Sequence, residues 1–253
     1  MVKILTWAGA AGKVTGVPTP NPPSNPVPAV PTVIAIDGPV ASGKTAVGRE
    51  LARRLGYRFI DTGLMYRACT HLALRSGVSV DDGLALGGLA ASVWMDLVVT
   101  PDGERLLVDG EDVTDALRTP QVEAHVSKVA AVGGVRVAMV AQQQRMAEEG
   151  RVVMVGRDIG TKVLPDAAKV YLDASPEERV RRRLAEVAGR QTEAEVRANL
   201  ELRDRTDSER EESPLEVAEG AVVVMTDDLE LGGVTEAVVR LLSEPRAGKG
   251  GAH

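Results

Sequence analysis

Short apolar runs alternate with amphipathic stretches over most of this chain, from about residue 32 to residue 243. Five of the apolar runs have the length and the β-branched composition of buried strands. They lie at residues 33–36, 58–60, 152–155, 169–173 and 221–225. Helical periodicity is present in six stretches. One ends at Gly56, the second ends at Ser76, and the others lie at about residues 82–94, 121–149, 176–210 and 234–242. Successive strand–helix units predict an α/β fold with a five-stranded parallel sheet flanked by helices.

Two segments depart from this alternation. Residues 97–100 and 105–108 read as short strands on either side of a turn, which predicts an antiparallel hairpin inserted into the parallel core. Residues 176–210 are helical and polar, with nine arginines and no lysine. We therefore expect a single domain over residues 32–243 that carries inserted segments, and a helix break near Gly133 within 121–149.

The two ends of the chain lack a core pattern. Seven of the fourteen prolines fall between Pro18 and Pro31, which disfavours helices and central strands. A weak signal-peptide pattern at the start is broken by Gly and Thr and is followed by Lys13. We expect residues 1–31 to form a disordered extension and the Gly-rich residues 244–253 to form a flexible tail.

Composition and charge exclude several classes of function. The net charge of −6 argues against wholesale binding of nucleic acid. Cys69 is the only cysteine, so an intrachain disulfide or a cysteine-cluster metal site is impossible, and the three histidines form no zinc pattern. No apolar stretch reaches the length of a membrane span. We expect a cytoplasmic protein that acts as a monomer, without membrane or nucleic acid.

A phosphate-binding loop follows the first strand. Gly38, Gly43, Lys44 and Thr45 match the spacing G-x-x-x-x-G-K-[ST]. Strand, glycine-rich loop and helix N-terminus together form a nest of N–H groups for phosphate oxygens, which makes a chance match improbable. The predicted loop consists of Gly38, Pro39, Val40, Ala41, Ser42, Gly43, Lys44 and Thr45. Lys44 would reach the β- and γ-phosphates, and the Thr45 hydroxyl would bind Mg²⁺, in a P-loop NTPase fold.

Arginines narrow the choice among nucleotide-binding proteins. Arg67, Arg157, Arg203, Arg205 and Arg210 follow strands or lie in the polar segment, and guanidinium groups suit bidentate contacts to phosphate. Since ligands bind at the carboxyl edge of a parallel sheet, these arginines predict a second phosphate beside the donor nucleotide. The arginines at 179–183, in contrast, fit a salt-bridged solvent face. A phosphate acceptor has a second pKa of about 6, so the transfer needs no general base.

Four motifs in register strongly resemble bacterial cytidylate kinases, over residues 32 to about 243. They are Ile34–Lys44, Asp61–Arg67, Gly156–Thr161, and Arg203–Ser208 with Arg210, Ser213 and Pro214. The resemblance implies transfer of the ATP γ-phosphate to CMP or dCMP with Mg²⁺. It also implies an acceptor-binding insertion at about 62–149, to which the hairpin belongs, and a mobile lid at about 175–214.

The resemblance also implies roles for individual residues. Thr62 and Arg67 would hold the acceptor phosphate and its surroundings, while Arg157 and Arg210 would bind phosphates and, with Lys44, support catalysis. Arg203 and Asp207 would approach the sugar. Ser127 and Arg136 match residues that read the cytosine, and Asp158 would help to fix the base. A carboxylate suits the amino donor of cytosine, and a hydroxyl or guanidinium suits its carbonyl acceptor.

Three alternatives remain open from the sequence. The acceptor could be UMP, dTMP or shikimate rather than CMP. The chain could be a nucleotide-dependent switch, although the guanine-reading N-K-x-D motif of GTPases is missing. An inactive structural relative is the third alternative, although such a chain should carry a degraded phosphate loop, and this loop is intact.

Overall fold

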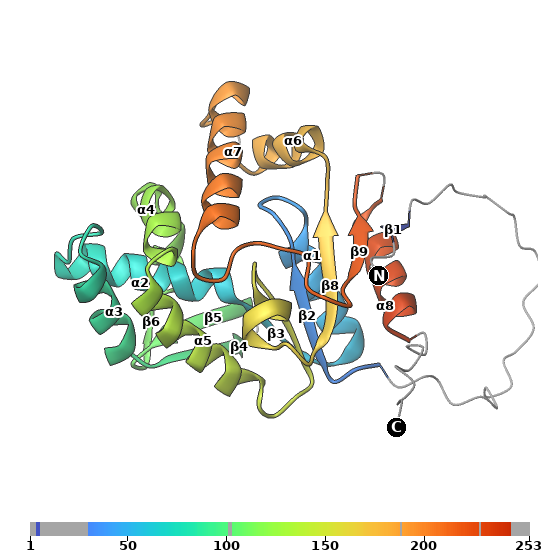
Figure 1. Cartoon of the computed structure of the whole chain (residues 1–253), viewed down its shortest axis with the longest axis horizontal. Helices are drawn as coiled ribbons and strands as arrows, with labels where there is room; N and C mark the ends of the chain where they lie inside the picture. Colours follow the sequence, from blue (N-terminus) through green and yellow to red (C-terminus); the bar gives the residue numbers. More distant parts are fainter. Residues whose placement is uncertain (1–3, 6–29, 101–102, 188, 228, 244–253) are drawn as a thin grey trace, which may run out of the picture.

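The computed structural model describes residues 4–5, 30–100, 103–187, 189–227 and 229–243, and its centre is a parallel sheet (Figure 1). From one edge to the other the strands are β3 (Arg58–Asp61), β7 (Val152–Val155), β2 (Val33–Asp37), β8 (Ala168–Asp173), β9 (Val222–Met225) and β1 (Ile4–Leu5). All neighbouring pairs are parallel. The five predicted strands are confirmed, and the two-residue β1 extends the edge beside β9. The other residues of the expected tails, 1–3, 6–29 and 244–253, lie outside the described residues.

The alternating side chains of β2 explain why both faces of the sheet are covered. Ile34 and Ile36 pack with α1 (Lys44–Leu55) and α8 (Leu231–Ser243) on one face. Ala35 points to the other face, which packs with α2 (Thr62–Ser76), α5 (Gly133–Ala147) and the π-helical turn η2 (Ile159–Val163). Because successive strand residues point to opposite faces, a continuous apolar run becomes a central strand buried on both sides.

Helix boundaries follow from capping residues that the sequence displays. Gly56 takes a left-handed conformation with φ 65° and ends α1, and Gly77 with φ 70° ends α2. The Asp61 carboxylate accepts the Gly63 N–H at the start of α2. Ser175 caps the helix that begins at Pro176, as expected, since its hydroxyl accepts the Glu178 N–H. Such caps satisfy backbone groups that a helix end leaves unpaired.

Everything between β3 and β7 forms an insertion beside the sheet (left in Figure 1). It begins with α2 and ends with α5. Between them are α3 (Gly83–Ser92), β4 (Met95–Thr100), β5 (Gly103–Val108), β6 (Glu111–Asp112), the 3₁₀ turn η1 (Thr114–Arg118) and α4 (Pro120–Ala130). The predicted hairpin is confirmed as β4–β5, although its turn residues 101–102 lie outside the described residues. The predicted break near Gly133 separates α4 from α5 by a bend of 95°.

No single helix in the described ranges has the length and apolarity to cross a bilayer. Only the bent pair α4–α5 meets that test, by length and composition alone.

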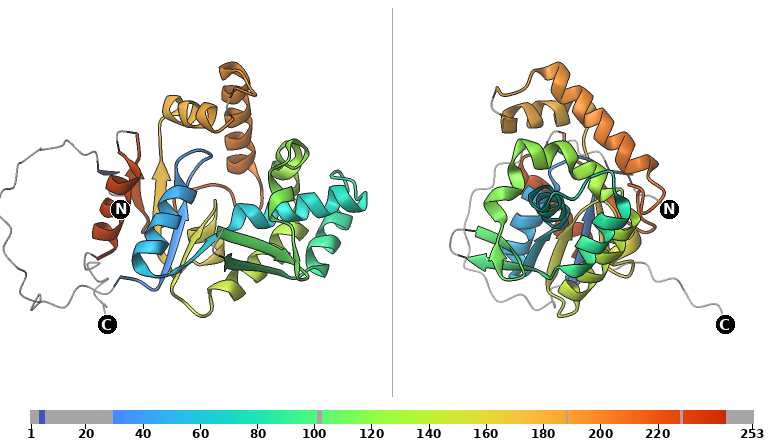
Figure 2. Two further views of the ribbon diagram at one scale, coloured as in Figure 1. Left: turned by 180° about the vertical axis from the view of Figure 1, so that it is seen from behind. Right: turned by 90° about the vertical axis from the view of Figure 1, so that its left-hand side faces the viewer.

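Two helices in the region of the expected lid stand above the carboxyl ends of the strands, and we call this pair the lid helices, or the lid (Figures 1 and 2). β8 leads into α6 (Pro176–Val187), which is followed by α7 (Glu193–Glu209). The two helices share a small apolar core made of Val180, Val187, Val196 and Leu200, and Val40 of the phosphate loop packs into it. The lid is therefore in direct contact with the predicted donor site.

Candidate active site

The backbone of the phosphate loop has the geometry of an anion nest. Gly38 has φ 148°, and a Cβ at this position would overlap the carbonyl oxygen of Leu172 in β8, so only glycine fits. Gly43 precedes α1 with φ 92°, provides no capping side chain, and is followed by no acid in the first turn. The first N–H groups of α1 therefore remain available for an anion, as they do in phosphate-binding loops.

Lys44 lies inside this loop with only 7% of its surface exposed. Its ammonium donates to the Pro39 carbonyl at 2.5 Å and to the Ser42 hydroxyl at 3.3 Å. Burial, followed by the charge of Arg157, lowers the pKa of Lys44 well below its usual value. An incoming phosphate would supply the negative charge that this buried ammonium lacks.

Two side-chain oxygens lie together at the end of the phosphate loop. The Thr45 hydroxyl donates to the Asp61 carboxylate at 2.9 Å, which joins the start of α1 to the end of β3. Over the described ranges, no cluster of three or more His, Cys, Asp or Glu side chains could hold a metal ion. A hydroxyl and a single carboxylate are nevertheless the kind of sparse oxygen set that Mg²⁺ uses when it keeps several waters and binds substrate phosphates.

The buried carboxylate of Asp37 connects the first strand to the segment after β7. It accepts the N–H groups of Ile159 at 2.9 Å and Gly160 at 2.7 Å. Burial raises the pKa of Asp37 to about 6, although these two hydrogen bonds oppose the shift. The strand that carries the phosphate loop therefore also fixes the position of Arg157 and Asp158. Only one signal in the sequence points to this role, an acid that ends a fully apolar strand.

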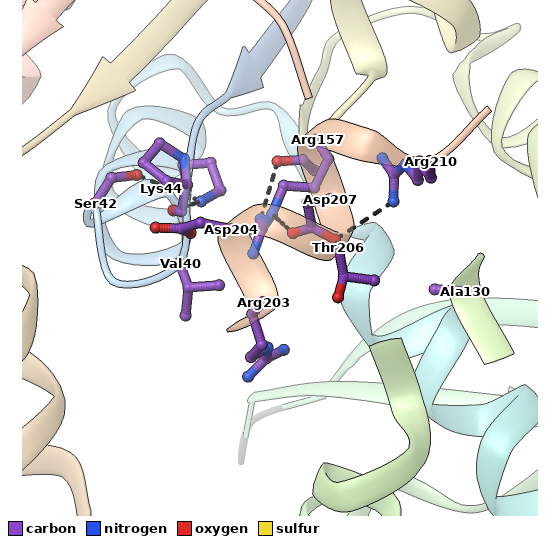
Figure 3. Close-up of polar contacts among 12 residues, drawn as sticks. Val40, Ser42, Lys44, Ala130, Arg157, Arg203, Asp204, Thr206, Asp207 and Arg210 are labelled. Atoms are coloured by element: carbon purple, nitrogen blue, oxygen red, sulfur yellow. Dashed lines mark hydrogen bonds and ion pairs between the residues drawn. The ribbon is translucent and has the colours of Figure 1, made fainter. Parts of the chain in front are cut away.

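Arg157 and Arg210 meet at one carboxylate in the lid (Figure 3). The Arg157 Nε donates to Asp207 at 2.8 Å, and the Arg210 Nη1 lies 3.5 Å from the other oxygen of the same group. Arg210 also donates to the Ser213 carbonyl at 2.5 Å, while its Nη2 is buried without a hydrogen-bond partner. Burial lowers the pKa of Arg210. A buried N–H that lacks an acceptor suits an incoming anion.

Arg136 and Asp158 form a buried ion pair, with 4% and 5% of their side chains exposed. Arg136 also donates to the Ala130 carbonyl at 3.1 Å and lies over the Tyr66 ring, 5.3 Å from its centroid. The Arg136 Nε and the Tyr66 hydroxyl are buried without partners. Two of the predicted base-reading residues therefore lie together, beside polar atoms that still lack a hydrogen bond.

A second charge cluster joins the insertion to the lid. Glu123 in α4 lies 2.8 Å from Arg67 in α2, 3.4 Å from Arg203 in α7 and 3.7 Å from Arg183 in α6. Burial raises the pKa of Glu123, but the three arginines outweigh this effect, and the pKa is below its usual value. Glu123 could not be predicted from the sequence, because nothing distinguishes it from other acids in the first turn of a helix. Ser127 lies one turn further along α4 and is half-buried.

Other predicted residues lie in different surroundings. The Thr62 hydroxyl is buried and donates to the Val155 carbonyl at the end of β7, at 2.9 Å. Arg205 is exposed. The expected surface ion pairs of α6 are present around Glu178. Arg179, however, is not one of these surface pairs. It binds Asp204 of α7 at 2.5 Å and lies 3.4 Å from the Val40 carbonyl of the phosphate loop.

Comparison with known proteins places this geometry in context. A protein-family model described as cytidylate kinase matches residues 34–244. Cytidylate kinases of Bacillus licheniformis and Geobacillus kaustophilus are each 46% identical to this chain over 216 and 215 residues, which is 83% of this chain and 96% of each relative. A shikimate kinase structure from Bacteroides thetaiotaomicron aligns with a TM-score of 0.46 at 16% identity, covering 84% of this chain and 98% of that one.

Proposed function

The chain belongs to the cytidylate kinase family, and on this premise we propose that it transfers the γ-phosphate of ATP to CMP and dCMP. One observation carries the proposal. A single line of charges runs from the phosphate loop to the lid: Arg157 lies close enough to Lys44 to lower its pKa, and the two arginines at positions 157 and 210 share Asp207. Such a line suits two phosphates that must approach each other.

The donor would bind along the loop from Gly38 to Thr45, with its phosphates at the first N–H groups of α1. Lys44 would exchange its two loop contacts for the β- and γ-phosphates. Thr45, with Asp61 beside it, would hold Mg²⁺, and these two oxygens fit the ion. When bound, Mg²⁺ neutralises charge on the transferring phosphate.

The acceptor would bind between the insertion and the lid. Its phosphate would meet Arg157, Arg210 and Arg67, with Thr62 in the surroundings, and its sugar would approach Arg203 and Asp207. Its base would meet Ser127 and the pair of Arg136 and Asp158. The unpartnered N–H groups at Arg136 and Arg210 support this proposal, because bound acceptor atoms would satisfy them.

The transfer itself would depend on position and charge rather than on a base. The acceptor phosphate is already an oxyanion near neutral pH, since its second pKa is about 6. Asp158, the carboxylate nearest to Arg157 in the sequence, is buried in its pair with Arg136 and is poorly placed to accept a proton. Arginines and Lys44 would stabilise the charge that spreads over the transferring group while the lid excludes water.

Cytosine would be chosen over uracil for an electrostatic reason. Asp158 can accept a hydrogen bond from the exocyclic amino group of cytosine, whereas uracil would present a carbonyl oxygen to the carboxylate. An unpaired acceptor facing another acceptor in a buried site lowers affinity strongly. We also propose that the protein acts as a monomer in the cytoplasm, without nucleic acid or membrane.

Turnover with a panel of acceptors tests the proposal. ADP release with ATP and Mg²⁺ is measured for CMP, dCMP, UMP, dTMP and shikimate, and kcat/KM should be highest for CMP and dCMP. Lys44→Met serves as the negative control, because it removes the donor ammonium from an otherwise intact loop. A preference for another acceptor would contradict the substrate assignment. Nucleotide binding without transfer to any acceptor would favour a switch protein instead.

A further inference from the structure

Glu123 lies at the point where three arginines from three helices converge. The arginines come from α2 and from both lid helices, so the carboxylate joins the acceptor-binding insertion to the lid. Within the described residues, Glu123 is the only hydrogen-bond partner of Arg67. Arg203 also contacts Glu123 while its Nε is buried without a partner. Glu123 therefore uses the guanidinium group of Arg67, which the acceptor phosphate would also seek, and that of Arg203 beside it.

The charges in this cluster give Glu123 a definite effect. Arg67, Arg183 and Arg203 carry three positive charges, and Glu123 carries one negative charge at neutral pH, since its burial does not raise its pKa above the usual value. A phosphate monoester brings a charge of about −1.5 to −2 near pH 7. The carboxylate thus repels the phosphate and occupies arginine N–H groups that would otherwise donate to it. The cluster is only partly exposed, with 28% of the Glu123 side chain and 18% of the Arg67 side chain accessible, so water screens this repulsion incompletely.

We propose that Glu123 is an internal anion that occupies Arg67, one of the arginines proposed for the acceptor phosphate, together with its neighbours Arg183 and Arg203, and lowers affinity for the acceptor by competing with its phosphate. The inference rests on the proposed function for the identity of the acceptor. In this structure the carboxylate holds together three arginines, Arg67, Arg183 and Arg203, that would otherwise repel one another. When the acceptor enters, its phosphate replaces the carboxylate, and when product leaves, the carboxylate returns.

The chain offers a matched control on the same lid arginine. Glu186 pairs with Arg183 at 2.8 Å, but its side chain is 58% exposed and it contacts neither Arg67 nor Arg203. Both Glu123→Gln and Glu186→Gln remove one negative charge next to Arg183 and keep the side-chain length. Only the first change alters the cluster where the phosphate would bind. An exposed pair such as the second contributes little energy.

Steady-state kinetics of the full-length protein with ATP and CMP tests this proposal. In Glu123→Gln we expect the KM for CMP to fall about fivefold to tenfold, because one repelling charge leaves a half-buried cluster. We expect kcat to be unchanged or lower, since the retained amide oxygen still orients Arg67. Glu186→Gln should match the wild type. An unchanged or higher KM for CMP in Glu123→Gln would overturn the proposal and make Glu123 a structural strut.

Binding of inorganic phosphate separates this inference from the substrate assignment. Calorimetry is done with the donor loop filled by a non-hydrolysable ATP analogue, so that phosphate has access to the acceptor-site arginines and not to the loop. Phosphate should bind Glu123→Gln more tightly than the wild type or Glu186→Gln, whatever acceptor the enzyme prefers. Equal phosphate affinity in all three proteins would refute the competition, even if wild-type turnover of CMP confirms the proposed function. Thermal melting checks that both variants are folded.

Discussion

Asp158→Asn tests the buried ion pair with Arg136 most directly. The change keeps the shape of the side chain and removes its charge, which leaves the buried Arg136 guanidinium without its counter-ion and with two neutral acceptors, the Ala130 carbonyl and the new amide oxygen. Removing one partner of a buried ion pair costs about 3–5 kcal/mol, because the other charge stays in the interior without compensation. Here the lower end applies, since the charge of Asp158 also contributes to the raised pKa of Asp37, and this repulsion is relieved.

A loss of about 3 kcal/mol corresponds to a fall in melting temperature of roughly 6–12 °C for a domain of this size. Thermal unfolding without ligand, followed by circular dichroism, measures it. The double variant Arg136→Met with Asp158→Asn removes the isolated charge and should recover part of the loss. A melting temperature of Asp158→Asn within about 2 °C of the wild type would refute this reasoning, because it would show that Arg136 is solvated or otherwise paired.

Three further changes probe other parts of the site. Arg157→Ala should lower kcat by about 10²–10³-fold, the cost of losing one group that stabilises transition-state charge. The melting temperature should change little, because Asp207 keeps its contact with Arg210 at 3.5 Å. A large fall in melting temperature would make Arg157 structural. Gly38→Ala should abolish ATP binding in a filter assay, because the added methyl overlaps the Leu172 carbonyl. Asp37 binds a proton more tightly when folded, with its pKa raised from 3.8 to about 6, so its contribution makes the free energy of unfolding fall as pH rises through that window. Asp37→Asn should flatten that slope in denaturant titrations, and an unchanged slope would contradict the burial argument.

The sequence predicted the sheet well because its strands are buried on both faces. A strand such as residues 152–155 must be apolar throughout, and glycines must end α1 and α2, so both signals are local. The phosphate loop was predictable for the same reason, since its function depends on backbone geometry that only a short, fixed spacing provides. These parts of the chain carry their structure within a few consecutive residues.

The partners within the site could not be predicted in the same way. Arg157 contacts an acid 50 positions later in the chain, and Arg67 contacts Glu123 56 positions away. Ion pairs at such separations depend on how the insertion and the lid meet, and no local pattern encodes that meeting. Likewise, the arginines of α6 look alike in sequence, yet Arg182 reaches the Thr226 hydroxyl and carbonyl whereas its neighbour Arg181 stays at the surface.

The strand order has a consequence for how such a protein can change. β2, which carries the phosphate loop, lies between β7 and β8, whereas all of the insertion is threaded between β3 and β7 at one edge. The phosphate loop and the insertion are thus encoded by separate blocks of sequence, whereas Asp158 and the arginines of α7 lie in a third block after β7. Evolution, or an engineer, could rebuild the insertion and the segment after β7 around a different small molecule and keep the phosphate loop as it stands.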